Sequence, residues 1–224
     1  MWRDQFDAMV FDCDGVLVDS EPIVNQVLRD DVAALGWEMT VSECVQTFVG
    51  ASLEGVRERI EQHLGRPVGD VWVVEFVQHR DDALRAGLRP VPGAAGLVAA
   101  AEEAFEGRIA CASNSDRAKI ELQLDKTGLL APFQGRIFSA AETGPEKPSP
   151  AVYLAAASSF EPPSSRPLVL EDSPSGVRAG KAAGGWVIGL AATVSADGLK
   201  EAGADVVVTS LSEVAGLLEA ESPR

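Results

Sequence analysis

Short hydrophobic segments alternate with helical stretches along most of the chain. The segments rich in β-branched residues cover positions 8–11, 108–112, 136–138, 168–170, 186–190 and 206–208. Because their side chains are apolar at consecutive positions, both faces of each segment are expected to be buried. Buried strands that alternate with helices are typical of a parallel sheet covered on both sides. The pattern therefore predicts an α/β fold with a doubly wound, Rossmann-like parallel sheet.

Residues that favour helix starts follow several of these segments. Ser115 precedes an amphipathic stretch at residues 116–124, and Ser-Pro pairs occupy positions 149–150 and 173–174. A serine hydroxyl can cap the first turn of a helix, and proline is favoured at the first helical position. Helices are therefore expected to begin at the carboxyl ends of the strands, which is the edge where such sheets bind ligands.

One stretch of the chain shows helical periodicity without a strand pattern. Between residues 20 and 89, apolar residues recur at intervals of three and four. This spacing is typical of amphipathic helices. We therefore predict a small all-helical cap domain at residues 18–89, inserted after the first strand. Residues 1–17 and 90–224 would then form the Rossmann-like core.

The chain carries a strong negative charge. Its 34 acidic and 19 basic residues give a formal net charge of −15. This charge repels nucleic-acid backbones and anionic membrane surfaces, so we expect neither as a partner. A small phosphorylated metabolite would also be repelled unless a cation attracted it locally, which favours a metal site.

Cysteine content and the N-terminal sequence bear on location. The three cysteines are widely spaced and form no C-x-x-C pair, which fits a reducing compartment. The sequence MWRDQF at the N-terminus lacks a cationic stretch followed by an apolar one. We therefore expect a cytoplasmic protein. We also expect it to be a monomer or a homodimer.

Two carboxylates stand at the end of the first predicted strand. In the sequence FDCDGVLVDSE at residues 11–21, Asp12 and Asp14 are two positions apart in the turn that leaves the strand. A calcium loop of the Asp-x-Asp type needs an oxygen ligand at its fifth position and glycine at its sixth. Val16 and Leu17 stand there, so a calcium loop is excluded.

Three later sites place polar residues at other strand ends. Ser113 and Asn114 offer a hydroxyl and backbone N–H groups beside a helix start, which is a natural cradle for phosphate oxygens. Lys147 can supply a fixed positive charge, and Glu171 and Asp172 form a second carboxylate pair. Each of these sites alone is equally compatible with a helix cap or a surface position. Their joint occurrence at strand ends, in this order, favours function.

Together these residues resemble the motifs of the haloacid dehalogenase superfamily of aspartyl phosphotransferases. The closest resemblance is to its helical-cap subgroup, which contains the β-phosphoglucomutases and many sugar-phosphate phosphatases. It extends over nearly the whole chain, and residues 171–184 match the last motif of that subgroup closely. It implies a doubly wound sheet with a cap inserted after the first strand, in agreement with the periodicity.

The resemblance implies roles for these residues. Asp12 would be the nucleophile and form an aspartyl-phosphate, while Asp14 would protonate the leaving alcohol and later activate water. Ser113, Asn114 and Lys147 would bind the phosphoryl group. We expect burial and neighbouring carboxylates to favour the protonated form of Asp14 at neutral pH.

The resemblance also implies a magnesium cofactor. Its ligands would be the Asp12 carboxylate, the main-chain oxygen of Asp14 and Asp172. Glu171 would be a further ligand or would support the others. Magnesium and a lysine together would stabilise the charge on a transferring phosphoryl group.

The same motifs discriminate among activities of this superfamily. Asp14 argues against a dehalogenase, which needs no proton donor for a leaving alcohol. The β-phosphoglucomutases carry a histidine and a phosphate-binding arginine where this chain has Val24 and Leu53. We therefore predict a phosphatase, with a phosphosugar mutase as the alternative if Arg57 or Arg59 replaces that arginine.

The substrate and a non-enzymatic alternative are less constrained. Glu21, Asn25, Gly50 and Ser52 lie on cap segments expected to face the site, so we predict that they contact a sugar or polyol leaving group.

A non-enzymatic alternative is a receiver-like domain that only accepts a phosphoryl group. Such a domain also combines aspartate, magnesium, hydroxyl and lysine. Such a domain needs no cap and about half this length, which makes it the weaker hypothesis.

Overall fold

The computed structural model describes residues 2–48, 53–192 and 194–219. The chain divides into two compact units. One unit contains Met1–Asp19 together with Arg89–Arg224, and the other contains Ser20–Leu88. We refer to them as the core unit and the helical unit, and each is described by itself.

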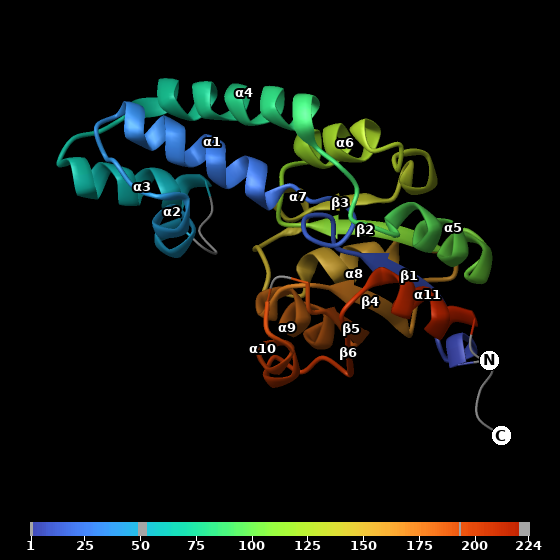
Figure 1. Ribbon diagram of the computed structural model, residues 1–224. Helices are drawn as coiled ribbons and strands as arrows, with labels where there is room; N and C mark the ends of the chain where they lie inside the picture. Colours follow the sequence, from blue (N-terminus) through green and yellow to red (C-terminus); the bar gives the residue numbers. More distant parts are fainter. Residues whose placement is uncertain (1, 49–52, 193, 220–224) are drawn as a thin grey trace. The chain divides into compact units, whose positions relative to one another are not determined.

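A six-stranded parallel sheet forms the centre of the core unit (Figure 1). Its spatial order is β3-β2-β1-β4-β5-β6, in which β1 pairs with both β2 and β4. The strands are β1 (Ala8–Phe11), β2 (Ile109–Ser113), β3 (Ile137–Ser139), β4 (Pro167–Glu171), β5 (Trp186–Leu190) and β6 (Val206–Val208). This order is that of a Rossmann-like doubly wound sheet, so the predicted fold class is confirmed.

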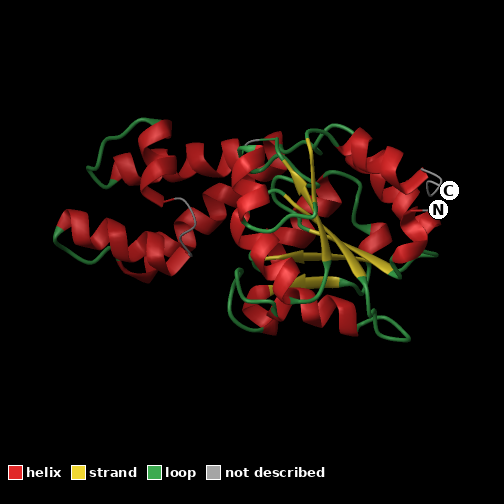
Figure 2. Cartoon of the chain, turned by 90° about the horizontal axis from the view of Figure 1, so that it is seen from below, coloured by secondary structure: helices red, strands yellow, loops and turns green. Residues whose placement is uncertain are grey.

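Helices cover both faces of the sheet (Figures 1 and 2). One face carries α5 (Ala94–Ala104), α6 (Arg117–Lys126) and α11 (Leu211–Glu219). The opposite face carries α8 (Ala151–Ser158), α9 (Pro174–Ala182) and α10 (Ala196–Glu201). The remaining short elements of the core unit are η1 (Trp2–Gln5), η2 (Ala131–Phe133) and α7 (Ala140–Thr143).

The central strands are buried along their whole length. Every residue of β1, β2 and β4 is buried, because helices pack on both sides of these strands. Alternate side chains point to opposite faces, so Val10 and Val169 join a cluster with Tyr153 and Val177 from α8 and α9. This packing holds the carboxyl ends of β1, β2 and β4 next to one another at one edge of the sheet.

Two of the predicted helix starts differ in detail from the structure. The cap of α6 is Asp116 rather than Ser115, because the Asp116 carboxylate accepts a hydrogen bond from the backbone N–H of Lys119. Helix α8 begins at Ala151, one residue after the proline that we expected at its first position. The third prediction is confirmed, since Ser173 caps α9.

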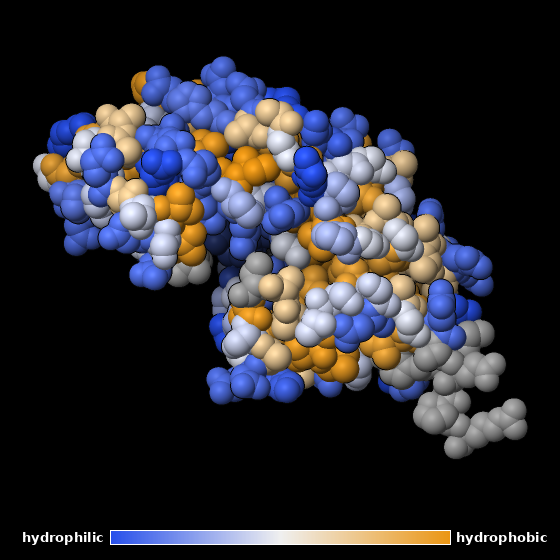
Figure 3. Space-filling model, viewed as in Figure 1, coloured by the Kyte–Doolittle hydropathy of each residue, from blue (hydrophilic) through white to orange (hydrophobic). Residues whose placement is uncertain are grey.

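The helical unit consists of four helices, as far as its described residues show. They are α1 (Glu21–Ala34), α2 (Val41–Phe48), α3 (Leu53–Leu64) and α4 (Gly69–Gly87). Their apolar faces meet in a cluster that includes Leu28, Phe48, Ile60, Trp72 and Phe76. The visible surface of these helices is mainly hydrophilic, with scattered apolar residues (Figure 3). No described helix in either unit combines the length and hydrophobicity needed to cross a membrane.

The two chain segments that lead to and from the helical unit are hydrogen bonded to each other. The N–H of Asp19 donates to Arg89 O at 3.1 Å, and the N–H of Val91 donates to Leu17 O at 3.0 Å. The insertion therefore leaves and rejoins the core unit at a single paired site directly after the β1 loop.

Candidate active site

The predicted core residues meet at the carboxyl edge of the sheet. Asp12 follows β1, Ser113 ends β2, Glu171 ends β4 and Asp172 follows it. Carboxylate oxygens of Asp12, Glu171 and Asp172 all lie within 4.8 Å of one another. The edge between β1 and β4 is the topological switch point of the sheet, where ligands bind in folds of this type.

Asp12 is a buried carboxylate with a lysine partner. Only 7% of the residue is exposed, and Lys147 Nζ donates to its Oδ1 at 2.6 Å. Burial raises the pKa of Asp12 to about 7, the Lys147 charge opposes that change and the Glu171 charge adds to it. Burial disfavours the charged form of a carboxyl group, so a cation is needed to keep Asp12 ionised.

Lys147 connects Asp12 to Glu171. Its Nζ donates to Glu171 Oε1 at 2.8 Å and to Ala112 O at 3.0 Å, in addition to Asp12. Burial opposes the charge of this ammonium, but Asp12 and Glu171 outweigh burial and hold the pKa of Lys147 well above its usual range. The site therefore contains a permanent positive charge. The Lys147 backbone N–H donates to Asn114 Oδ1 at 2.9 Å, so the Asn114 side chain holds the lysine loop.

Glu171 is fully buried and surrounded by donors. Its Oε1 accepts from Lys147 and from the hydroxyl of Tyr153 at 2.6 Å, and its Oε2 accepts from the N–H groups of Asp172 and Ser173 and from the Ser173 hydroxyl. Burial tends to raise the pKa of Glu171, but Lys147 and these donors lower it overall. Since its oxygens already accept these bonds, Glu171 is better placed to orient Lys147 and Asp172 than to coordinate a metal directly.

Tyr153 is part of the site although no sequence pattern indicated it. The residue is 1% exposed on α8, and Lys147 Nζ lies 4.7 Å from the centre of its ring. Burial and the Glu171 charge raise the pKa of Tyr153 well above its usual value, so its hydroxyl acts as a donor. It is the only tyrosine of the chain, in an alanine-rich helix, and that isolation is the one signal that could have drawn attention to it.

Three hydrogen-bond donors surround the Asp14 carboxylate. Its carboxylate accepts hydrogen bonds from Ser115 Oγ at 2.7 Å, Lys119 Nζ at 3.0 Å and Gln123 Nε2 at 2.8 Å. Asp14 also interacts electrostatically with the Asp12 carboxylate. The expected protonation of Asp14 at neutral pH stays a prediction.

The carboxylate cluster fits a hard divalent cation. Carboxylate oxygens are the ligands that Mg²⁺ and Ca²⁺ prefer in proteins. The buried carboxylates of Asp12 and Glu171 share the one ammonium of Lys147, so two negative charges face one positive charge there. A divalent cation held by Asp12 and Asp172 would compensate that charge.

A glycine permits Asp172 to approach the β1 loop. Gly15 has a φ of +79°, and a Cβ atom at this position would lie 1.9 Å from Asp172 Oδ2. The glycine of the Asp-x-Asp-Gly sequence thus serves both the turn and the close approach of the carboxylate. Gly176 has a similar role on α9, where a Cβ would lie 1.7 Å from Glu171 Oε1.

Gly15→Ala is expected to destabilise the protein because it combines a strained φ with a clash. The left-handed conformation costs a residue with a Cβ about 1–2 kcal/mol, and displacing the Asp172 carboxylate adds about 1–3 kcal/mol. The matched control is Gly128→Ala, at a φ of +73° with no atom within 4 Å of the added Cβ. Urea unfolding of both variants measures the difference. Equal losses would mean that Asp172 shifts freely and does not need the glycine.

The predicted cap residues belong to the helical unit, which is described by itself. Glu21 is the exposed first residue of α1, and Asn25 is half-buried on the same helix. Gly50 and Ser52 lie outside the described residues. The contacts of these four residues with a leaving group stay predictions.

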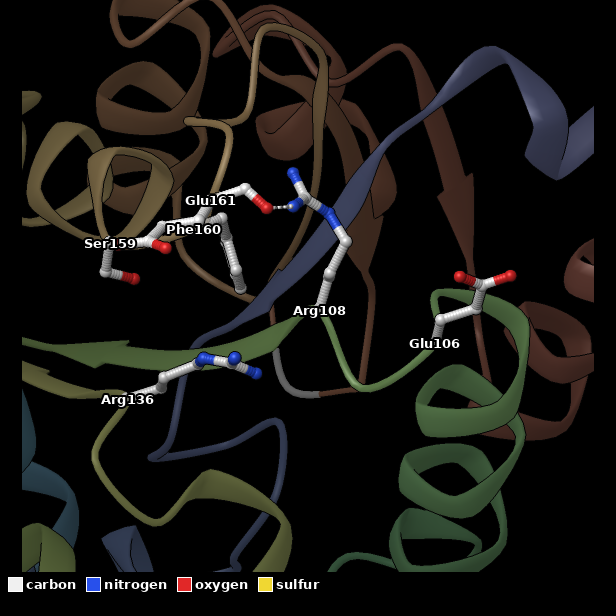
Figure 4. Close-up of a pocket in the computed structure, with 6 residues that line it drawn as sticks. All are labelled: Glu106, Arg108, Arg136, Ser159, Phe160 and Glu161. Carbon is white, nitrogen blue, oxygen red and sulfur yellow. Dashed lines mark hydrogen bonds between the residues drawn. The ribbon is translucent and has the colours of Figure 1, made fainter.

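A separate pocket of about 410 Å³ lies at the opposite edge of the sheet (Figure 4). Arg108 and Arg136, which directly precede β2 and β3, line it, and both guanidinium groups lie over the ring of Phe160. Arg108 donates to backbone oxygens of Asp7, Glu161 and Pro162, and Arg136 donates to Gly107 O. These arginines stabilise loops at the amino ends of the strands through hydrogen bonds, away from the carboxylate cluster.

A family model agrees with this geometry. The model of the haloacid dehalogenase-like hydrolases matches residues 6–184, which is more than half of the chain. The chain belongs to this family. The resemblance identified in the sequence is therefore confirmed, and the family membership makes the chain a hydrolase.

Individual relatives of this haloacid dehalogenase-like hydrolase are moderately similar. It is 29% identical over 217 residues to SUPPRESSOR OF QUENCHING 1 of Arabidopsis thaliana, a match that covers 92% of this chain but 20% of that protein. It is 27% identical over 213 residues to glycerol-1-phosphate phosphohydrolase 2 of Saccharomyces cerevisiae, covering 90% of this chain and 81% of that protein.

A solved structure supports the same assignment. The crystal structure of a family hydrolase from Deinococcus radiodurans, with bound phosphate and sodium, is 31% identical with a TM-score of 0.76. The match covers 96% of this chain and 99% of that one.

Proposed function

We propose that this hydrolase is a phosphatase that cleaves a small phosphate monoester through an aspartyl-phosphate on Asp12. The observation that carries the proposal is the buried Asp12 carboxylate at the switch point of the sheet. This carboxylate accepts a hydrogen bond from Lys147 Nζ, and Asp14 follows it two residues later. Phosphoryl transfer depends mainly on positioning and on neutralising charge, and a buried carboxylate beside a fixed cation supplies both.

In the first step, an Asp12 carboxylate oxygen attacks phosphorus and the bond from phosphorus to the leaving oxygen breaks. Lys147 stabilises the negative charge of the phosphoryl oxygens, and the Ser113 hydroxyl at the end of β2 is placed to donate to them. Asp14 transfers a proton to the leaving alkoxide, which departs as an alcohol.

In the second step, Asp14 accepts a proton from water while the water oxygen attacks phosphorus. The bond between phosphorus and Asp12 breaks, inorganic phosphate forms, and Asp12 returns as a carboxylate. A covalent route of this kind uses two acids in one turn, because one attacks and the other moves protons.

The proposed cofactor is Mg²⁺, held by the carboxylates of Asp12 and Asp172 and by the main-chain oxygen of Asp14, with Glu171 in support. When bound, it would supply further charge neutralisation to the phosphoryl oxygens. The fit rests on the buried cluster of oxygen ligands and on the two carboxylates that share the Lys147 ammonium. The −15 net charge of the chain makes a local cation more important for an anionic substrate.

The proposed substrate class is a sugar or polyol phosphate. The yeast relative is named for the hydrolysis of glycerol-1-phosphate, a polyol phosphate.

The phosphosugar mutase is less favoured, because Arg57 and Arg59 already have partners within the helical unit. Arg57 is paired with Glu54 and Asp70, and Arg59 donates to Thr47 O. These partners account for both arginines without a second phosphate. The family match to hydrolases likewise favours an enzyme over a receiver-like domain.

A substrate panel tests the proposal directly. Phosphate release is measured from phosphorylated sugars, polyols and small acids, with Mg²⁺ or with a chelator. Magnesium-dependent release from one class would support the proposal and rank its substrates. No release, together with interconversion of a hexose phosphate after addition of a bisphosphate, would replace it with the mutase.

Mg²⁺ is expected to stabilise the folded protein independently of turnover. A cation that binds only the folded state adds about 2.7 kcal/mol at a free concentration one hundred times its Kd. Thermal unfolding with increasing Mg²⁺ measures this effect, and Asp172→Asn should abolish it. Asp125→Asn, which changes an exposed carboxylate on α6, is the matched control and should respond like the wild type. An unchanged response in Asp172→Asn would place the metal elsewhere.

The affinity for Mg²⁺ is expected to fall below neutral pH. Burial raises the pKa of Asp12 to about 7, so at lower pH a proton occupies the carboxylate that the metal requires. For one competing proton the apparent affinity decreases about tenfold for each pH unit below that value. Titration calorimetry at pH 5.5, 6.5 and 7.5 measures this dependence. A constant affinity across that range would show that Asp12 is not a ligand.

A further inference from the structure

Three residues on one face of α6 and its preceding turn hold Asp14. Ser115, Lys119 and Gln123 are spaced by four residues, which places them above one another along a helix. Each of them donates a hydrogen bond to the Asp14 carboxylate. None of them belongs to the motifs identified in the sequence.

The contacts of these three residues reach both oxygens of the Asp14 carboxylate. Lys119 Nζ lies 3.0 Å from Asp14 Oδ1 and 3.2 Å from Oδ2, and it also donates to Ser115 Oγ at 2.9 Å. Ser115 Oγ donates to Oδ2, and Gln123 Nε2 donates to Oδ1. Both oxygens therefore have a neutral donor and share the ammonium, which prevents free rotation of the carboxylate about its terminal bond.

Two of the three partners, Gln123 and Lys119, are themselves held in place. Gln123 is fully buried, and its Oε1 accepts a hydrogen bond from Cys13 Sγ at 3.5 Å. The Lys119 side chain is 12% exposed, in contrast to the exposed Lys126 one helix end away. Ordering a lysine side chain costs rotamer entropy, so favourable contacts are needed to hold Lys119 at this depth.

We propose that Lys119 is a positioning residue, which together with Ser115 and Gln123 holds the proton-transferring carboxylate of Asp14 in place. The inference rests on the proposed function and deepens it. Asp14 sits on a loop next to Gly15, and proton transfer requires its oxygen within hydrogen-bond reach of the leaving oxygen and later of water. A displacement of about 1 Å can reduce a rate by about a hundredfold.

Leaving groups distinguish positioning of Asp14 from a general effect on folding. An alkyl phosphate needs a proton on its leaving oxygen, whereas p-nitrophenyl phosphate releases a stabilised phenolate without one. The experiment compares the wild type with Lys119→Met, Lys119→Arg and Lys126→Met. Its substrates are p-nitrophenyl phosphate and the alkyl phosphate that the wild type hydrolyses fastest, both with saturating Mg²⁺.

For Lys119→Met we expect kcat on the alkyl phosphate to fall about a hundredfold with little change in KM. On p-nitrophenyl phosphate the same variant should release a burst of about one nitrophenolate per enzyme, because attack by Asp12 persists while water activation by Asp14 is slow. Lys119→Arg should recover part of the loss, and Lys126→Met should match the wild type. Ser115→Ala, a smaller change, should shift the kinetics in the same direction.

The results that would contradict a positioning role for Lys119 can be distinguished from one another. Equal losses on both substrates without a burst would assign Lys119 a purely structural role, and a rise in KM alone would make it a substrate contact. Either result overturns the inference while the proposed function stands, as does wild-type behaviour of both Lys119→Met and Ser115→Ala. A wild type that hydrolyses no ester overturns the proposed function, and this inference with it.

Discussion

Asp12→Asn is expected to reduce phosphate release by on the order of 10⁴-fold or more. An amide of the same size cannot attack phosphorus, so the covalent intermediate does not form and no second step can follow. The remaining residues, including Ser113 and Lys147, would still bind the phosphate group, and Asp172 would still be available to Mg²⁺. We therefore expect the variant to bind a substrate without turning it over, as measured by phosphate release and by calorimetric titration.

The control for this prediction separates the loss of a nucleophile from a loss of structure. Asp12→Asn keeps the side-chain volume, and Lys147 retains its contacts with Glu171 and Ala112 O. Its circular dichroism should match the wild type, and Asp125→Asn should retain full activity. Turnover of Asp12→Asn within tenfold of the wild type would mean that water attacks the ester directly, with no aspartyl-phosphate.

Lys147→Met is expected to impair both stability and activity. The substitution leaves the Asp12 and Glu171 carboxylates buried without their shared ammonium, and breaking a buried ion pair in this way costs about 3–5 kcal/mol. Loss of one charge that stabilises the phosphoryl oxygens should also reduce kcat by about 10²–10³-fold. Urea unfolding in the presence of chelator and phosphate release with Mg²⁺ measure the two effects.

An exposed ion pair provides the matched comparison. Lys181 Nζ contacts Asp205 at 2.7 Å, but both side chains are partly exposed. Lys181→Met should therefore cost less than about 1 kcal/mol and leave activity unchanged. If Lys147→Met were as mild as Lys181→Met, the buried carboxylates would have to be neutral in the folded protein, and the fixed positive charge would have no part in the reaction.

The main features of the fold followed from local sequence patterns. The strand segments were predictable because parallel strands covered on both faces must be apolar at successive positions, as in β1. The helical insertion followed from a change of period after that strand. Helix starts were less secure, because Ser115 and Asp116 are both good caps, and the choice depends on whether Ser115 has another partner. In the folded chain its hydroxyl is bonded to Asp14.

Part of the candidate site was also accessible from the sequence. Asp12, Ser113 and the Glu171-Asp172 pair stand at strand ends, and the carboxyl ends of parallel strands share one edge of the sheet. Lys147 was harder, since it lies on a loop between α7 and α8 and not at a strand end as we expected. Its place between Asp12 and Glu171 is a property of the folded chain.

By itself, then, the sequence determined the order of strands and helices, the family and the residues that end the central strands, because these depend on short-range patterns. The tertiary structure decided how those residues are held. Tyr153 reaches Glu171 across 18 positions and Lys119 reaches Asp14 across 105, and such contacts depend on the packing of α8 and α6 against the sheet. The direction of a side chain across packed elements leaves no trace in residue spacing, which is why both residues were missed.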